Sequence, residues 1–170
     1  GEFAFDKDKA KDLLNSAGWK AGSDGILEKG GKRLSLKLQT PEGAYPNDVL
    51  VAETIQDQLK DLGVEVEIQK VESSTFWDGL KQAEGKADFD MVLWGYNPSH
   101  GDGYIHLDAM FKTNSDAGEV PPQWNHIWYS NSEVDELLDN ASKIVDMKER
   151  TEVLGQAQEI IWDEAPYIWL

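Results

Sequence analysis

The sequence of 170 residues contains no cysteine, and its 16 lysine and arginine residues are outnumbered by 32 aspartate and glutamate residues. Without cysteine the chain can form neither a disulfide framework nor a thiolate metal site. The formal net charge of -16 repels the phosphate backbone of nucleic acids and anionic membrane surfaces. We therefore expect no nucleic-acid partner.

The sequence also lacks an apolar run of about 18 residues, the length that a membrane-spanning helix requires. No stretch has the pattern of a signal peptide. This absence says nothing about the cellular compartment if the chain is a piece of a longer protein. Residues 1–3 resemble a cloning scar, and Trp169-Leu170 lie inside an apolar segment. We expect residues 4–170 to be a single domain, because 40% hydrophobic and 28% charged residues are globular values.

Motifs of covalent chemistry are missing as well. There is no GxSxG sequence, no Walker loop and no dinucleotide fingerprint. A carbohydrate-active enzyme, the alternative that we retain, needs two carboxyl groups about 5–10 Å apart. Nothing selects such a pair from the 32 acids. The sequence therefore favours a binding protein over an enzyme.

Hydrophobic periodicity predicts helices and strands in the order β, α, β, α, β, followed by two helices. This order is typical of an α/β fold in which helices cover a sheet. The predicted helices are Asp6–Ala17, Asn47–Leu62, Ser74–Ala83, one starting at a capping box of Ser132 and Asp135 and running to Val145, and one from Asp146 to Pro166. The predicted strands are Ile26–Glu28 and Leu34–Leu38 in a hairpin, Val64–Ile68, Phe89–Leu93 and Tyr167–Leu170, with a loop at Pro41–Pro46 and a short apolar piece at Ile105–Phe111.

The most informative stretch is FDMVLWGYNPSHGDGY, residues 89–104. It begins as a buried strand and then becomes a loop rich in aromatic, amide and glycine residues. Ligands of open α/β sheets bind at the carboxyl ends of strands, where aromatic rings give contact area and short polar groups give orientation. We predict that the ligand-binding residues are Trp94, Tyr96, Asn97, Ser99 and Asp102.

Two other groups of residues are candidates for a functional role. His100, Asp102, His106 and Asp108 offer imidazole and carboxylate ligands, but their spacing matches no metal motif, so we expect no metal and no cofactor. The aromatic residues between Trp124 and Tyr129 either cover a cleft or close a small satellite core, and the sequence does not decide between these two roles.

Six segments taken together resemble family 5 of the extracellular solute-binding proteins, which serve oligopeptide, dipeptide, nickel and some oligosaccharide ABC importers. The resemblance covers nearly the whole chain from Ala4 onward, in order. The segments are FDKDKAKDLLNSAGW, SDGILEKGGKRLSLKLQTP, EVEIQKVESSTFWDGL, FDMVLWGY, YSNSEVDELLD and AQEIIWDEAPYI.

The resemblance implies that the chain is the second ligand-gripping lobe of a two-lobed, periplasmic-binding-protein-like fold that closes on a hinge. It implies a peptide or oligosaccharide ligand, the other lobe of the same protein as a partner, and an ABC permease in the membrane. The full-length protein would be periplasmic or extracellular, exported or lipid-anchored. We expect the isolated lobe to be a monomer.

In peptide-binding members of this family, the strand that matches Phe89–Leu93 leads to an aromatic residue, which Tyr96 matches. Three residues later these members carry an aspartate for the peptide ammonium, but this chain has Ser99 there, and the nearest acid is Asp102. Leu93 also stands where some oligopeptide-binding members carry an arginine. These departures favour a neutral ligand such as an oligosaccharide, which the aromatic and amide groups of the loop could bind.

Overall fold

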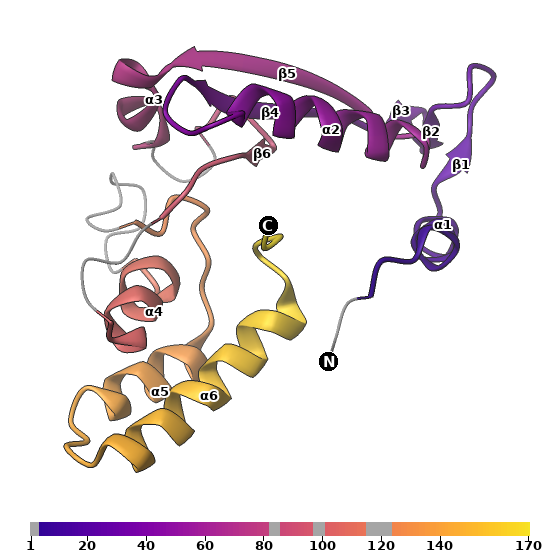
Figure 1. Ribbon diagram of the computed structural model, residues 1–170. Coiled ribbons are helices and arrows are strands. Elements are labelled where there is room, and N and C mark those ends of the chain that lie inside the picture. Colours follow the sequence, from indigo (N-terminus) through magenta and orange to yellow (C-terminus); the bar gives the residue numbers. More distant parts are fainter. Residues whose placement is uncertain (1–3, 82–85, 97–100, 115–123) are drawn as a thin grey trace. The chain divides into compact units, whose positions relative to one another are not determined.

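The computed structural model describes residues 4–81, 86–96, 101–114 and 124–170. The chain divides into two compact units, labelled by element in Figure 1. The sheet unit comprises Phe3–Gly79 and Ala87–Gly95, and the helical unit comprises Leu80–Lys86 and Tyr96–Leu170. The expected mixture of α and β elements is confirmed, while the single domain over residues 4–170 stays a prediction.

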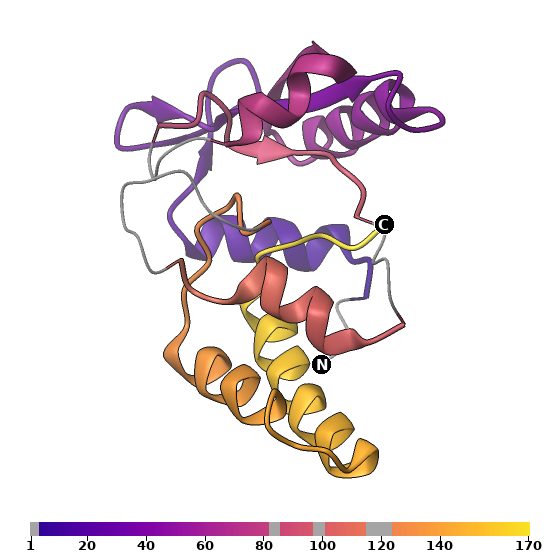
Figure 2. The same ribbon diagram turned by 90° about the vertical axis from the view of Figure 1, so that its left-hand side faces the viewer.

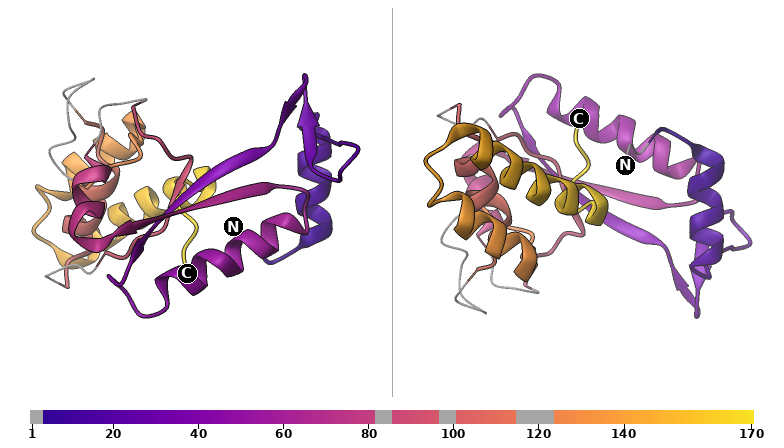
Figure 3. Two further views of the ribbon diagram at one scale, coloured as in Figure 1. Left: turned by 90° about the horizontal axis from the view of Figure 1, so that it is seen from above. Right: turned by 90° about the horizontal axis from the view of Figure 1, so that it is seen from below.

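The sheet unit is built on a parallel sheet with the strand order β5-β4-β6. The two long strands, β4 (Ser35–Glu42) and β5 (Glu65–Glu72), run side by side in Figure 3. The short strand β6 (Met91–Val92) pairs with β4 at Leu38 and Gln39. Helix α2 (Asp48–Lys60) connects β4 to β5 and packs against both. The result is a βαβ unit, which brings the carboxyl ends of all three strands to one edge.

The core of this unit lies between α2 and the sheet. Alternate residues of the strands face the helix, as the period of two in a strand requires. The residues buried there are Leu38, Ala52, Val64 and Val66, with half-buried leucine, isoleucine and methionine side chains around them.

The remaining elements of the sheet unit are short. Helix α1 begins after Asp6, whose side chain accepts a hydrogen bond from the Lys9 amide at 2.9 Å, so the predicted N-cap is confirmed. A three-stranded antiparallel sheet follows, in which β2 and β3 join across Gly30-Gly31. These elements are α1 (Lys7–Ser16), β1 (Lys20–Ala21), β2 (Leu27–Lys29), β3 (Lys32–Arg33) and, after β5, α3 (Ser73–Leu80).

In the helical unit, α4 (Gly103–Phe111) packs against α5 (Ser132–Ala141) and α6 (Met147–Glu164), and α5 lies beside α6 (Figure 2). Helices α5 and α6 bury part of the apolar stripe that the sequence predicts for each of them, and α4 covers the segment that the sequence predicted only as a short apolar piece. The buried side chains are Leu107, Met110 and Phe111 from α4, Val134, Leu138 and Ala141 from α5, and Ala157 and Ile161 from α6. No helix among the residues that the structure describes has the length and apolarity to cross a membrane.

Several sequence-based boundaries were wrong for identifiable reasons. Pro41 was assigned to a loop but lies inside β4, where it pairs with Val71. A proline is tolerated there because the pairing of β4 with β6 ends at Gln39, which leaves β4 a partner on one side only. The cap of α5 is Asn131 rather than Ser132, since the Asn131 side chain accepts bonds from two amides of the first turn.

Two further expectations failed near the carboxyl end. Helix α5 ends at Ala141, and Val145, predicted to belong to its apolar face, is 93% exposed. Residues 167–170 follow the end of α6 but form no strand in the described chain. The predicted start of α6 is confirmed, and Asp146 is its N-cap, because its side chain accepts bonds from the amides of Lys148 and Glu149.

Candidate functional site

Three aromatic residues gather at the carboxyl edge of the parallel sheet. Trp94 follows β6, Tyr45 follows β4 and Trp77 lies in the helix after β5. The rings of Trp77 and Trp94 are 5.9 Å apart, edge to face. The Tyr45 hydroxyl donates a hydrogen bond of 2.7 Å to the carbonyl of Gly95. Trp94 therefore lies at the edge where the topology predicts ligand binding.

Gly95 lies close to the Tyr45 ring. A Cβ atom at position 95 would lie 3.0 Å from Cε1 of Tyr45 and 3.2 Å from Cζ. A side chain at this position would therefore require the ring to move by a few tenths of an ångström, so the arrangement favours glycine. Tyr45, which lies in the predicted loop Pro41–Pro46, thus anchors the turn after β6 through its bond to the Gly95 carbonyl.

Tyr96 belongs to the helical unit, since the division between the units falls after Gly95. Its half-buried ring lies 4.8 Å from the ring of His106 in α4, edge to face. It also lies 5.9 Å from the ring of Trp124. The structure therefore places Tyr96 beside Trp124, one of the three aromatic residues (Trp124, Trp128 and Tyr129) whose role the sequence left open.

Asp102 has two partners within the helical unit. One carboxylate oxygen, Oδ1, accepts the Tyr104 amide at 3.0 Å and caps α4. The other, Oδ2, lies 3.0 Å from Nη2 of Arg150 in α6, and the two side chains are only 34% and 19% exposed. The guanidinium also covers the ring of Tyr104, 5.1 Å from its centroid. Arg150 therefore compensates the charge of Asp102.

Two of the five predicted residues, Asn97 and Ser99, lie outside the described residues, as does His100. Their contact with ligand stays a prediction. Of the remaining three, Tyr96 and Asp102 belong to the helical unit and Trp94 belongs to the sheet unit.

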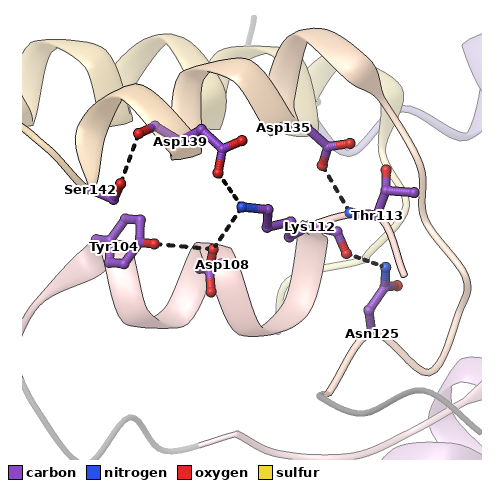
Figure 4. Close-up of polar contacts among 8 residues, drawn as sticks. All are labelled: Tyr104, Asp108, Lys112, Thr113, Asn125, Asp135, Asp139 and Ser142. Carbon is purple, nitrogen blue, oxygen red and sulfur yellow. Dashed lines mark hydrogen bonds and ion pairs between the residues drawn. The ribbon is translucent and has the colours of Figure 1, made fainter. Parts of the chain in front are cut away.

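A polar network connects α4 to α5 in the helical unit (Figure 4). The ammonium group of Lys112 binds the carboxylate of Asp139 and lies 3.9 Å from that of Asp108. Asp108 also accepts a bond from the Tyr104 hydroxyl at 3.2 Å. The hydrogen bond between them raises the pKa of Lys112 and lowers the pKa of Asp139, so both are charged near neutral pH. The start of the segment after α4 is thereby fixed on α5.

Asn125 anchors the segment 124–129, which carries the aromatic residues whose role the sequence does not decide. Its side chain is completely buried. Its amide nitrogen donates to the carbonyls of Lys112 and Tyr129 at 3.0 and 2.8 Å, and its amide oxygen accepts the Tyr129 N–H at 2.9 Å. The hydroxyl of Tyr129 in turn donates to Glu164 of α6. Residues 125–129 are therefore anchored to α4 and α6 by side-chain hydrogen bonds, although they form no regular element.

The two described histidines lie near this segment. Burial lowers the pKa of His106, and burial together with the charge of Lys81 lowers that of His126. Both imidazoles are therefore neutral near pH 7. Among residues 4–81, 86–96, 101–114 and 124–170, no three histidine or acidic side chains gather in a way that could hold a metal ion. The described side chains offer aromatic rings and hydrogen-bonding groups, which are suited to binding a ligand noncovalently.

Sequence reasoning missed Tyr45, His106 and Arg150 as neighbours of the predicted site residues. Tyr45 could have been found, because the carboxyl ends of parallel strands share an edge. Arg150 could not, since nothing in the local pattern of α6 indicates a partner in the loop before α4.

Comparison with known proteins identifies the family. The profile described as "Bacterial extracellular solute-binding proteins, family 5 Middle" matches residues 1–118. The oligopeptide-binding protein AppA of Bacillus subtilis is 32% identical over 170 residues, which cover 99% of this chain and 30% of that protein. The probable D,D-dipeptide-binding periplasmic protein DdpA of Escherichia coli is 35% identical over 125 residues, covering 74% of this chain and 23% of that protein.

Solved structures agree with this assignment. The structure of NikZ from Campylobacter jejuni in complex with Ni(L-His) superposes with a TM-score of 0.85 at 25% identity, covering all of this chain and 32% of that one. The structure of AppA from Bacillus subtilis in complex with a nonapeptide superposes with a TM-score of 0.83 at 32% identity, covering 98% of this chain and 31% of that one. The expected relation to periplasmic binding proteins is confirmed.

The chain spans less than a third of the length of these relatives. They are solute-binding proteins and not enzymes, so the carbohydrate-active enzyme retained as an alternative finds no support. With a family profile that matches residues 1–118 and relatives that align along nearly its whole length, the chain belongs to family 5 of the bacterial extracellular solute-binding proteins.

Proposed function

We propose that the chain is one lobe of the solute-binding component of an ABC importer, which captures a peptide between two lobes by hinge closure. The observation that carries the proposal is the alignment of 99% of the chain with an oligopeptide-binding protein. Other relatives are named as dipeptide-binding and glutathione-binding proteins. A peptide is therefore the first ligand class to test.

The full-length protein would act outside the cytoplasm, in the periplasm or at the cell surface, by export or through a lipid anchor. It would deliver its ligand to a permease in the membrane. The description of the family as extracellular supports this location. An acidic surface suits this role as well, because a net charge far from zero keeps a protein soluble and monomeric.

The lobe proposal also rests on helix α1, none of whose residues is buried. Leu13 on its apolar face is 62% exposed, and Phe5 just before the helix is 80% exposed. Isolated helices shorter than about 12–15 residues are marginal in water, and most helical stability comes from packing an apolar face. The relatives are about three times as long as this chain, so the remaining polypeptide is available to cover α1.

We expect Leu13→Asp to destabilise the full-length protein by about 2–3 kcal/mol, because a buried leucine is lost and a charge is introduced. The same substitution in the 170-residue chain should change the free energy of unfolding by less than about 0.5 kcal/mol. Leu50→Asp is the matched control, since Leu50 is 59% exposed on α2, whose other face already packs on the sheet. Equal effects of Leu13→Asp in both proteins, measured by denaturant unfolding, would contradict the proposal that α1 is covered.

A ligand screen of the full-length protein by thermal shift tests the proposed function directly. A ligand present at 100 times its Kd adds about 2.7 kcal/mol to the free energy of unfolding. We expect di- to nonapeptides to raise the melting temperature. A response to oligosaccharides with none to peptides would replace the peptide by a sugar and leave the transport function in place.

The oligosaccharide is a second candidate because Asp102 is already paired with Arg150. A carboxylate with a guanidinium at 3.0 Å has less attraction left for a peptide ammonium. The Ser99 found where peptide-binding members carry an aspartate points in the same direction.

Asp102→Asn distinguishes the two uses of this side chain. Asparagine caps helices as well as aspartate does, so the substitution removes the charge and keeps the cap. If Arg150 is the main partner of Asp102, Kd for the identified ligand should change by less than about threefold. A loss of about ten- to hundredfold, measured by calorimetry, would mean that the carboxylate binds a ligand ammonium. Asp146→Asn, at the N-cap of α6, is the control for stability, because it shows how much the free energy of unfolding changes when a capping aspartate loses its charge.

A further inference from the structure

Trp124 is a large aromatic residue that the helical unit leaves 40% exposed. Its position is nevertheless fixed, because its backbone N–H donates a 3.0 Å hydrogen bond to the carbonyl of Ala109 in α4. The next residue, Asn125, is the completely buried side chain that ties the segment to Lys112 and Tyr129. The fold thus holds the Trp124 backbone in place without burying the ring.

The backbone near Trp124 carries a conformational cost. Trp128 has a φ of 56°, in the left-handed region that bulky residues rarely adopt. Such conformations persist where the surrounding structure enforces them, and they cluster at ligand-contacting segments. A satellite core would explain a buried tryptophan, but it does not explain a partly exposed one at the start of an enforced segment.

Trp124 belongs to a group of four rings contributed by three segments. Its ring is 5.9 Å from that of Tyr96 and 5.7 Å from that of His126, and Tyr96 is 4.8 Å from His106. We call Tyr96, His106, Trp124 and His126 the four-ring cluster. Because its imidazoles are neutral near pH 7, the cluster offers uncharged ring surface, of which Trp124 is the exposed member and Tyr96 and His106 are half-buried.

An uncharged aromatic surface binds a ligand mainly through the area of contact between the two. Rings of this size give apolar and aromatic ligand groups a large contact area, whereas an anionic side chain would be desolvated against their electron-rich faces. A cationic side chain is disfavoured because the positive charge of Lys81 already acts on His126. The chemistry of the four-ring cluster therefore fits an apolar side chain.

We propose that Trp124 contacts the ligand and forms, with Tyr96, a subsite for an apolar or aromatic side chain of a bound peptide. The inference rests on the proposed function, since it assumes that the full-length protein binds peptides. It gives the irregular segment after α4 a role in specificity.

The test uses the full-length protein and a defined set of peptides: the all-alanine nonapeptide and its variants with a single phenylalanine at each position in turn. Calorimetry should find one phenylalanine position that binds wild-type protein most tightly. Trp124→Ala should weaken that peptide by about 5- to 100-fold, the usual effect of losing an aromatic anchor, and weaken the all-alanine peptide by less than about threefold. Trp169→Ala is the matched control, because Trp169 is 49% exposed in the same unit, and it should change neither Kd by more than about twofold.

Tyr96→Ala separates the failure of this inference from the failure of the proposed function. If Tyr96→Ala weakens binding and Trp124→Ala does not, the inference is overturned and the proposed function stands. If folded wild-type protein binds none of the peptides, the proposed peptide function fails and the inference fails with it. Equal weakening of both peptides by Trp124→Ala would overturn the side-chain subsite.

A second measurement covers the case in which Trp124→Ala does not fold. Wild-type protein labelled with 5-fluorotryptophan gives one fluorine resonance per tryptophan, and Trp124→Phe assigns the resonance of Trp124. Adding the best phenylalanine peptide should shift this resonance more than adding the all-alanine peptide does. An unchanged Trp124 resonance at saturation would overturn the inference.

Discussion

Phe111→Ala should lower the free energy of unfolding of the helical unit by about 3–5 kcal/mol, the usual cost of deleting a fully buried phenylalanine ring. Phe111 has no exposed surface. Its ring meets Tyr129, Tyr167 and Trp169 at centroid distances of 5.7, 5.4 and 6.2 Å. The substitution therefore leaves a cavity and also removes aromatic contacts to two segments that no helix contains.

Hydrogen exchange of the amides in α4, α5 and α6 measures this effect, because it reports on the helical unit separately from the sheet unit. Phe5→Ala is the control: the same substitution at a residue that is 80% exposed should change protection by less than about 0.5 kcal/mol in the 170-residue chain. A loss below about 1.5 kcal/mol for Phe111→Ala would mean that its neighbours collapse into the space, and that the ring does not organise this core.

The elements that the sequence predicted well carry their signals locally. Asp6 and Asp146 stand just before apolar stripes of period 3.6, and both cap the helices that follow. The alternation of apolar and polar residues around Leu36 and Leu38 predicts a strand for the same reason, since a period of two can be recognised within a few residues. The N-cap cannot be predicted from the sequence where two adjacent residues can both cap the helix, as Asn131 and Ser132 can. Tertiary contacts then decide which residue becomes the cap, and in α5 it is Asn131.

Strand pairing limits the prediction elsewhere. Pro41 reads as loop in the sequence, yet it extends β4 because β5 offers a partner along the whole strand. The sequence predicts a strand at residues 167–170, but in the described chain these residues pair with no strand. In both cases, whether a strand forms depends on pairing with segments that are distant in the sequence, and hydrophobic periodicity contains no information about such pairing.

The candidate site shows the same division. The end of a buried strand, followed by aromatic and amide residues, was enough to select Trp94 and Tyr96. The side chains that surround them were not predictable, because His106 and Trp124 meet Tyr96 only through tertiary packing. Asp102 illustrates the risk of reading a loop acid as a ligand group, since Arg150, which meets its carboxylate, comes from a helix much later in the chain.

Asn125→Ala should cost the helical unit about 2–4 kcal/mol, because it removes the fully buried side chain that satisfies three backbone groups of half-buried residues. The carbonyls of Lys112 and Tyr129 would lose their donor, and the Tyr129 N–H would lose its acceptor. A methyl group cannot replace these bonds, and the complete burial of Asn125 leaves little access for water.

Two variants sharpen the Asn125 experiment. Asn114→Ala removes one half-buried amide that donates to the Asn125 carbonyl at 3.2 Å, and it should cost only about 0.5–1.5 kcal/mol. Asn125→Asp keeps the shape and the acceptor but places a carboxylate oxygen against two carbonyls, so it should destabilise the unit at neutral pH at least as much as alanine does. Hydrogen exchange in α4 and α6 gives the comparison. If Asn125→Asp is as stable as the wild type, the donor bonds to Lys112 and Tyr129 do not hold the segment, and the placement of Trp124 must depend on its own contacts with α4.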